Sequence, residues 1–361
     1  MRCIWLFLLA LLASPLSAQT LHPALHPATG LWGYRDSLGQ WAIAAGYWAV
    51  SPFVDGHALV TVDEEKFIRP DGSVFPPLYR VKGSRSWRPQ HLIDRQGRIR
   101  CSLPVGYQAD PWALPAEGLL PVRNPAGLYG YVDTLGNLVL PFRFAQAWSF
   151  GEGRAAVQVR PEDVDSLYYR LPQALQDPFD RALREWRSDQ PELIREGFPH
   201  GGISTVFIDP QGEVQAFLPA RYYAVEDGAF RFSQGLLPCR DLLEEKEGML
   251  GEGFAVALPF QYDRIGLPQA NRAFAVRTPT YRGLAPPGET VVGFIDLAGM
   301  PVFDISESFL ADAECSYWVQ GYPMNARGGW LVLNPADCAE RRFLRVSEQG
   351  ELVEYFTHPA R

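Results

Sequence analysis

One short pattern recurs along this chain: Asp, two variable residues and Gly, placed each time between two β-prone runs. Self-similarity along a sequence is the signature of a repeat architecture, in which small units stack on one another and none folds alone. The pattern therefore restricts the chain to a modular fold. Five of its copies are Asp36 and Gly39, Asp94 and Gly97, Asp133 and Gly136, Asp209 and Gly212, and Asp296 and Gly299.

The Asp and the Gly have mechanical roles in a short turn. An Asp side chain accepts hydrogen bonds from turn amides further along the chain, and a Gly three residues later supplies the positive φ that closes a hairpin. We therefore expect all five pairs to be structural turn residues. A row of calcium ligands is the alternative, but calcium needs about six converging oxygens and one Asp per unit does not supply them.

The clearest copy predicts three strands in succession. A strand at 129–133 leads through a turn at 134–137 into a second strand from Leu138, and Glu152-Gly153 separates this from a third strand at 155–159. Acidic residues followed by Gly also close other copies, as in Asp55-Gly56 and Glu117-Gly118. We expect each unit to be a three-stranded antiparallel piece that buries its apolar face against its neighbours.

The composition agrees with many short strands separated by turns. Phe (21), Tyr (15) and Trp (10) are abundant, as are Gly (33) and Pro (31). We therefore predict an all-β fold of about seven tandem antiparallel three-stranded β-repeats, with a short helical insert. A propeller-like ring and an open superhelical array both fit a unit of about 40 residues.

Two stretches carry a family resemblance. Leu31-Trp32-Gly33-Tyr34, and residues 127–133 with the later Phe150-Gly151-Glu152-Gly153, resemble the WG-repeat family of bacterial proteins, named for its Trp-Gly pair. Trp32-Gly33 keeps the literal pair, and Tyr129-Gly130 substitutes the first aromatic residue. The family has no generally established activity, so the resemblance implies a repeat scaffold and brings no catalytic residues with it.

The N-terminus is typical of a secretory signal. A short positive start, an apolar stretch at 4–12 and a small-residue exit at 14–18 predict cleavage after Ala18. An uncleaved anchor is the alternative. No later stretch is long and apolar enough for a transmembrane helix, so we expect an exported protein, periplasmic or secreted.

Five segments make up the predicted domain organisation. Phe179, Ala182, Leu183 and Trp186 fall at helical spacing and interrupt the repeats. This insert either packs on the sheets or binds a partner. The segments are a signal peptide at 1–18, a Pro-containing spacer at 19–30, N-terminal WG-type repeats at 31–160, the helical insert at 161–200, and degenerate C-terminal WG-type repeats with a cap at 201–361.

Four cysteines remain after removal of the signal. In an oxidising compartment disulfides form, and four cysteines allow three pairings. Cys315 and Cys338 are the closest pair in the sequence, and we favour a disulfide between them. Four buried free thiols are the alternative.

The sequence contains no constellation that requires an enzyme. It has no H-E-x-x-H, no G-x-S-x-G, no Walker loop and no strand followed by G-x-G-x-x-G, so we predict no catalytic, cofactor-binding or metal-binding residues. A net charge of −8 argues against a nucleic-acid partner, because the phosphate backbone demands a basic surface.

These features favour a non-catalytic exported repeat protein that serves as a binding or scaffold module of the cell envelope. Its partner is a protein or a glycan, since aromatic rings suit both sugar faces and protein interfaces. The alternative is an envelope hydrolase that acts on glycans through carboxylates gathered on one face of the array, because such carboxylate pairs come from distant strands.

Overall fold

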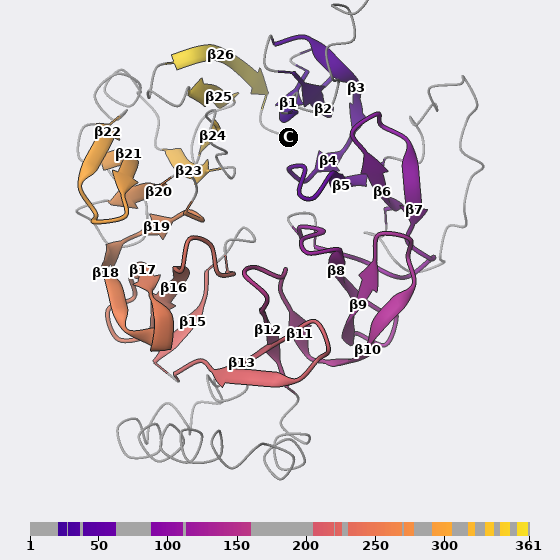
Figure 1. Ribbon diagram of the computed structural model, residues 1–361. Coiled ribbons are helices and arrows are strands. Elements are labelled where there is room, and N and C mark those ends of the chain that lie inside the picture. Colours follow the sequence, from indigo (N-terminus) through magenta and orange to yellow (C-terminus); the bar gives the residue numbers. More distant parts are fainter. Residues whose placement is uncertain are drawn as a thin grey trace, which may run out of the picture.

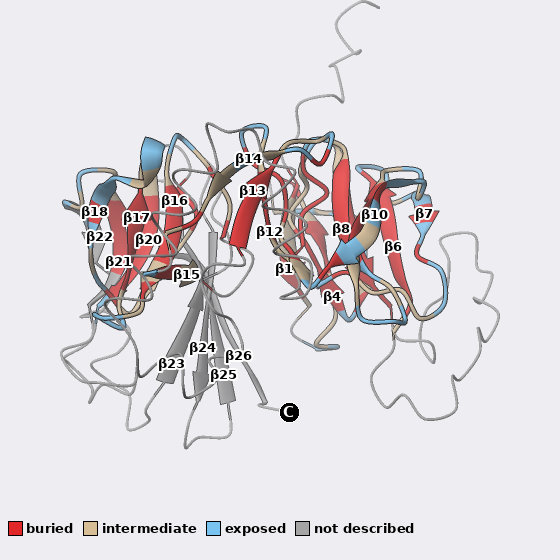
Figure 2. Cartoon of the chain, turned by 90° about the horizontal axis from the view of Figure 1, so that it is seen from below, coloured by how far each residue is buried: buried red, intermediate tan, exposed pale blue. Residues whose placement is uncertain are grey.

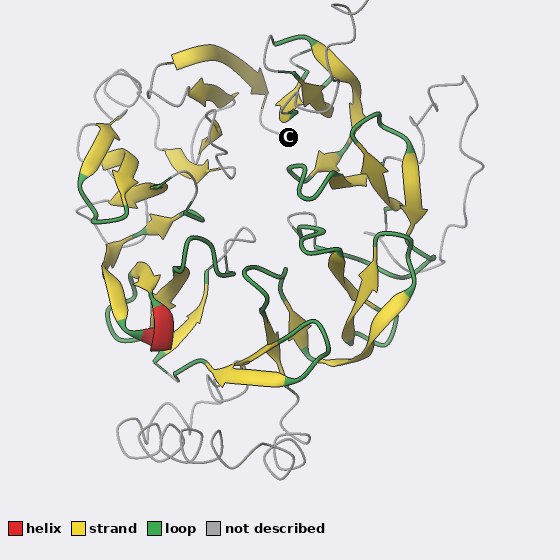
Figure 3. Ribbon diagram, viewed as in Figure 1, coloured by secondary structure: helices red, strands yellow, loops and turns green. Residues whose placement is uncertain are grey.

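The computed structural model is an all-β structure. The residues that it describes are 21–26, 28–36, 39–62, 88–110, 113–159, 205–219, 221–225, 230–268, 271–277, 291–304, 317–321, 329–335, 340–346 and 352–359. Within them the only helix is a short 3-10 turn at Glu252–Phe254 (Figure 3). The predicted signal peptide, the predicted helical insert and the predicted pair of Cys315 and Cys338 lie outside the described residues.

The described strands form seven antiparallel sheets that follow one another in chain order. The first three sheets are β1 (His22–Leu25), β2 (Trp32–Arg35) and β3 (Trp41–Tyr47); β4 (Ala49–Val50), β5 (His57–Thr61), β6 (Gln90–Asp94) and β7 (Ile99–Ser102); and β8 (Leu119–Arg123), β9 (Tyr129–Asp133) and β10 (Leu138–Phe144).

The remaining four sheets have four strands each. They are β11 (Gln146–Ala147), β12 (Ala155–Gln158), β13 (Thr205–Ile208) and β14 (Val214–Phe217); β15 (Tyr222–Ala224), β16 (Leu237–Asp241), β17 (Glu247–Leu250) and β18 (Val256–Tyr262); β19 (Arg264–Ile265), β20 (Arg272–Arg277), β21 (Val291–Asp296) and β22 (Pro301–Asp304); and β23 (Tyr317–Gly321), β24 (Gly329–Pro335), β25 (Glu340–Val346) and β26 (Leu352–Pro359).

The sheets are arranged around a central axis in a propeller-like manner (Figure 1). The first strand of a sheet, such as β4, lies nearest the axis, and the last strand, such as β7, lies at the periphery. Seen from the side, buried residues fill the strands and exposed residues gather in the connecting loops and on outer strands (Figure 2).

The sequence repeat and the sheet do not coincide. In the clearest copy, the strands at 129–133 and 138–144 belong to the third sheet, whereas the strand at 155–158 pairs with β13 in the fourth. The expected three-stranded unit is therefore wrong, and most sheets have four strands. The reason is the corner at Ala145, whose N–H already bonds to Gln158 of the next sheet at 2.8 Å.

The expected spacer also differs from the structure. Residues His22–Leu25 are extended, but they form β1 and pair with all four residues of β2. Pro23 within β1 does not prevent pairing, because β1 is an edge strand and tolerates the loss of an amide donor. The N-terminal segment thus completes the first sheet.

The first, third and fifth sheets share one irregularity. Their outer strands β3, β10 and β18 are each seven residues long and bury their third and seventh positions. In the third sheet, Tyr131 pairs with Leu140 but Tyr129 pairs with Phe144, so β10 bulges between these pairs. The same offset separates the pairs Tyr34–Ile43 and Trp32–Tyr47, and the pairs Met249–Leu258 and Glu247–Tyr262.

The glycine of the Trp-Gly pair is required by this bulge. A Cβ on Gly33 would lie 2.7 Å from backbone atoms of β3, one on Gly130 would lie 2.6 Å from the carbonyl oxygen of Leu140, and one on Gly248 would lie 2.8 Å from that of Leu258. Since these are close approaches of two backbones, only glycine fits. By the same criterion, β17 and β18 repeat the local structure of β2 and β3 and of β9 and β10.

The cores lie between successive sheets. One cluster combines Tyr131 and Leu140 of the third sheet with Val157 and Val206 of the fourth. Similar clusters join the first and second, second and third, fourth and fifth, and fifth and sixth sheets. Each of the first six sheets therefore buries apolar residues against its neighbours, as the repeat pattern predicts.

Candidate functional site

The predicted Asp and Gly residues lie at hairpins between the last two strands of five sheets. In each hairpin the Gly N–H donates to the Asp carbonyl oxygen at 2.8–3.0 Å, and each Gly has a φ between 76° and 88°. A carboxylate oxygen of the Asp also accepts the N–H of the fourth residue after it. In four of the five hairpins it accepts the N–H of the second residue as well. We call these five connections the rim turns.

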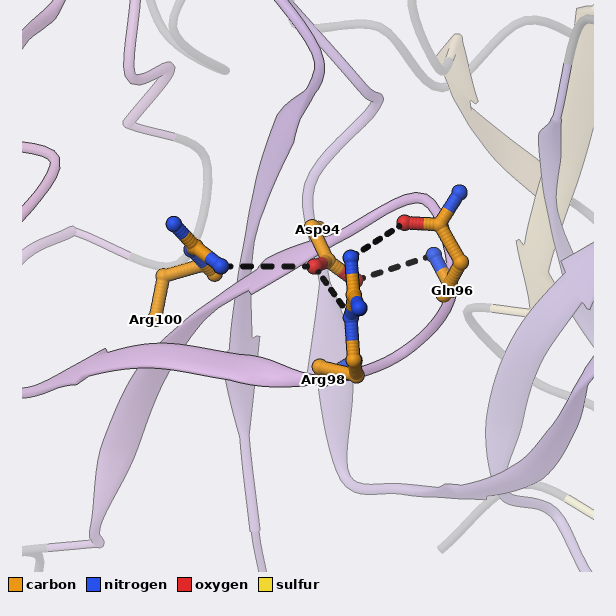
Figure 4. Close-up of polar contacts among 4 residues, drawn as sticks. All are labelled: Asp94, Gln96, Arg98 and Arg100. Carbon is orange, nitrogen blue, oxygen red and sulfur yellow. Dashed lines mark hydrogen bonds and ion pairs between the residues drawn. The ribbon is translucent and has the colours of Figure 1, made fainter. Parts of the chain in front are cut away.

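The rim turn at Asp94 carries the densest set of polar contacts (Figure 4). Its carboxylate accepts the N–H of Gln96 at 3.0 Å and the Nε of Arg98 at 2.8 Å, and Arg100 lies 3.9 Å from it. Burial would raise the pKa of Asp94, but the hydrogen bonds from Arg98 and Gln96 and the charge of Arg98 outweigh it and lower this pKa. The carboxylate is therefore held in its charged form.

The rim turns also contact the preceding sheet. A Cβ on Gly136 would lie 2.5 Å from the Sγ of Cys101 on β7, and one on Gly212 would lie 3.1 Å from Leu140 on β10. The Arg143 guanidinium adds a hydrogen bond of 3.2 Å to the Gly212 carbonyl oxygen. Gly97 and Gly299 approach the outer strands β3 and β18 in the same way. The predicted turn residues thus link neighbouring sheets at the periphery.

A second set of hairpins lies near the central axis (Figures 1 and 3). They precede β5, β8, β12, β16 and β20, and we call them the axial turns. Each contains an exposed polar residue with a φ between 49° and 61°. These residues are Asp55, Glu117, Glu152, Gln234 and Asn271, and the first four are each followed by a Gly that also has positive φ.

The axial turns are joined by hydrogen bonds from one sheet to the next. Asp55 accepts the N–H of Glu117 at 2.7 Å, Glu117 accepts the N–H of Gly153 at 2.9 Å, and Glu152 accepts the N–H of Gly235 at 3.1 Å. Gln234 then accepts the N–H of Asn271 at 3.0 Å and donates its own side-chain N–H to Asn271 at 3.0 Å. We call this series, which spans the second to sixth sheets, the axial chain.

Arg231 is a positive charge close enough to interact with two carboxylates of this series, those of Glu117 and Asp55. Its Nη1 donates to the carbonyl oxygen of Phe150 at 3.2 Å, which links the fifth sheet to the fourth. Burial lowers the pKa of Arg231, while the charges of Glu117 and Asp55 act in the opposite direction. The guanidinium therefore offsets part of the negative charge that these axial turns bring together.

The axial chain is the candidate functional site. It gathers polar side chains of five sheets at fixed positions on one face, because antiparallel strands place these hairpins at the same end of the sheets as the rim turns. Among the described residues, no group of three or more His, Cys, Asp or Glu is placed to hold a metal ion.

The sequence marks the axial turns but not the bonds between them. An acidic residue followed by Gly is a hairpin signal, and it is present at three of the positions. The acceptor and donor of one link lie as far as 83 residues apart, so no local pattern pairs them.

None of the described helices has the length and apolar character needed to cross a membrane. Together, the fold and the two sets of turns define a repeat protein of small antiparallel β-sheets in a propeller-like array. The family model described as WG containing repeat matches residues 32–65 and 129–160. The chain therefore carries WG repeats in these two regions, which confirms the resemblance deduced from the sequence. Each match covers the outer strands of one sheet and the first two strands of the next.

Solved structures of low identity align with most of the chain. BamB from Moraxella catarrhalis is 11% identical, with 95% of this chain and 83% of that chain covered and a TM-score of 0.34. The WD40 β-propeller domain of Doa1 is 10% identical, with 87% and 84% covered and a TM-score of 0.37. A putative exported protein from Bacteroides fragilis is 8% identical, with 95% and 75% covered and a TM-score of 0.30. No curated protein matches the sequence. The fold assignment rests on the strand pairing described above.

Proposed function

We propose that this protein is a non-catalytic exported repeat protein that binds a protein or glycan of the cell envelope and acts there as a scaffold. The observation that supports this proposal best is the axial chain. Exposed side chains of five successive sheets are held in place by bonds to one another, so a partner meets a surface that is already ordered.

Preorganisation favours binding because less conformational freedom is lost when the complex forms. Ordering a flexible side chain at an interface costs about 0.5–1.5 kcal/mol. The side chains of the axial turns are already ordered in the folded protein, so much of this conformational entropy is not lost on binding. The sheets behind them are rigid, since their apolar faces are buried against their neighbours. A broad and fixed polar surface of this kind suits a macromolecular partner.

The alternative of a glycan hydrolase has less support. The carboxylates of Asp55, Glu117 and Glu152 lie in neighbouring axial turns, but an oxygen of each one already holds the next hairpin. A hydrolytic pair needs one carboxyl that donates a proton and another that attacks or activates water. Carboxylates engaged as acceptors from backbone amides fit a positioning role better.

Export is supported by the sequence of residues 1–18, with its positive start, apolar centre and small-residue exit. Fractionation of cells that produce the full chain is the direct test. Recovery of a protein that begins near Gln19 in the periplasm or medium is expected, and retention of the whole chain in the cytoplasm would contradict this part of the proposal.

We place the partner on the axial face, and charge variants test this placement. Full-length protein is immobilised and exposed to envelope extract, and the captured components are compared by mass spectrometry. Glu152→Lys is expected to lose the partner, whereas Glu244→Lys, in the connection at the opposite end of the fifth sheet, is expected to keep it. Glu152→Gln retains an acceptor oxygen and separates the effect of charge from that of geometry. Equal capture by Glu152→Lys and wild type would exclude the axial face.

A further inference from the structure

We propose that the axial chain is a directional clasp, in which each sheet holds the axial hairpin of the sheet that follows it. Every backbone link has its acceptor side chain on the earlier sheet and its donor N–H on the later one. Glu117 illustrates the order: its own N–H is held by Asp55 of the second sheet, and its carboxylate holds Gly153 of the fourth.

The backbone conformation of the clasp residues indicates that their side chains are needed. Glu117 and Glu152 both have a φ of 54°, in the left-handed region that glycine adopts most easily. A residue with a side chain costs roughly 1–2 kcal/mol there. In the rim turns the residue with a positive φ is the glycine. Each of the five axial turns instead has a residue with a side chain at a positive φ. At Asp55, Glu117, Glu152 and Gln234 the acceptor side chain accounts for this difference, since glycine there would close the hairpin but leave the N–H of the next axial turn without its acceptor.

The end of the clasp is built differently from its middle. Gln234 and Asn271 exchange two hydrogen bonds of 3.0 Å, one through a backbone N–H and one between their side chains. An amide can donate and accept, whereas the carboxylates of Asp55, Glu117 and Glu152 only accept. The reciprocal amide pair therefore ends the series at the sixth sheet. Each carboxylate before it only accepts an N–H from the sheet that follows, so these links all run in one direction.

A directional clasp makes a prediction that differs from that of hydrogen bonds which only stabilise the whole fold. Removal of one acceptor should release the hairpin of the following sheet and leave the preceding link intact. In Glu117→Gly the N–H of residue 117 still reaches Asp55, while the N–H of Gly153 loses its acceptor. Glycine is favoured at this φ, so the substitution does not strain its own hairpin.

Amide hydrogen exchange of the full-length protein, followed by NMR, tests the clasp. In Glu117→Gly the Gly153 N–H is expected to exchange about fivefold faster or more, because the net value of such a bond is about 1 kcal/mol. The N–H of residue 117 should keep its wild-type rate. Glu117→Gln should restore protection of Gly153, since its amide oxygen accepts at the same place.

Two further variants keep the test decisive. Glu152→Gly should release the Gly235 N–H and leave the Gly153 N–H protected, which repeats the experiment one sheet further along. Glu245→Gly relieves a φ of 52° in the connection that follows β16, and it should leave both axial amides unchanged. Unchanged exchange at Gly153 in Glu117→Gly, or equal acceleration at residue 117 and Gly153, would overturn the proposal.

Discussion

Gly33 faces the backbone of Ala45 so closely that a Cβ at Gly33 would lie 2.7 Å from the Ala45 nitrogen. The contact arises where β3 bulges away from regular pairing with β2. Replacing Gly33 with Ala should lower the free energy of unfolding by about 1–3 kcal/mol, the usual cost of forcing extra volume into a packed site. Urea denaturation followed by circular dichroism measures the change.

Gly46 provides the matched control for Gly33. It lies in the bulge of the same sheet, but a Cβ there would have no heavy atom within 4 Å. Gly46→Ala should therefore change the free energy of unfolding by no more than about 0.5 kcal/mol. If the two substitutions had equal effects, the close approach would not be the reason for the glycine.

The buried hydroxyl of Tyr131 should also contribute to stability. Tyr131 is fully buried, and its hydroxyl donates to the carbonyl oxygen of Trp148 at 2.8 Å, as Tyr34 does to Ser51 at the same distance. Tyr131→Phe leaves that carbonyl without this donor and should cost about 1–3 kcal/mol. Tyr129 lies two residues earlier on β9 and is only partly buried, so Tyr129→Phe should cost less than half as much in the same assay.

Asp133 should stabilise its rim turn through its carboxylate. One oxygen accepts the N–H of Leu135 at 2.9 Å and that of Asn137 at 2.8 Å. Asp133→Ala should cost about 1–2 kcal/mol in thermal or urea unfolding. Asp133→Asn retains one acceptor oxygen and should recover at least half of that loss; an Asn variant as unstable as the Ala variant would argue against the hydrogen bonds.

Acid should weaken the rim turns. Burial would raise the pKa of Asp133, but the hydrogen bonds from Asn137, Leu135 and Gly136 outweigh it and lower this pKa below 3.8, as at Asp94. A depressed folded pKa stabilises the protein fully above the unfolded value, and this contribution disappears as pH falls through the folded value. The melting temperature should therefore drop below about pH 4, and the drop should be smaller in Asp94→Asn.

The rim turns could be predicted from the sequence because the hydrogen bonds that close each hairpin join residues at most four positions apart. At Asp133 the acceptor, both amide donors and the glycine belong to one short segment, so local turn chemistry determines the structure. The sequence also shows the glycine of the Trp-Gly pair, but it does not show why a glycine is required at that position. That reason is a bulge in the neighbouring strand, which depends on where Leu140 and Phe144 pair.

The composition of the sheets and the axial chain could not be predicted from one sequence. Strand 155–158 resembles a third member of its own repeat, and only the corner at Ala145 assigns it to the next sheet. The links of the axial chain join residues 36 to 83 positions apart in its second and third steps. Nothing in the local sequence of Glu117 or Glu152 distinguishes an inter-sheet acceptor from an ordinary exposed carboxylate.

The offset between repeat and sheet determines where the chain can be divided. A fragment cut at the edges of a Trp-Gly repeat would carry half of one sheet and half of another, with two unpaired strand edges prone to aggregation. Cuts after Ser102 or after Phe217 instead follow the last strand of a complete sheet. Soluble fragments should therefore begin and end at the boundaries of sheets, because the boundaries of the sequence repeats fall inside sheets.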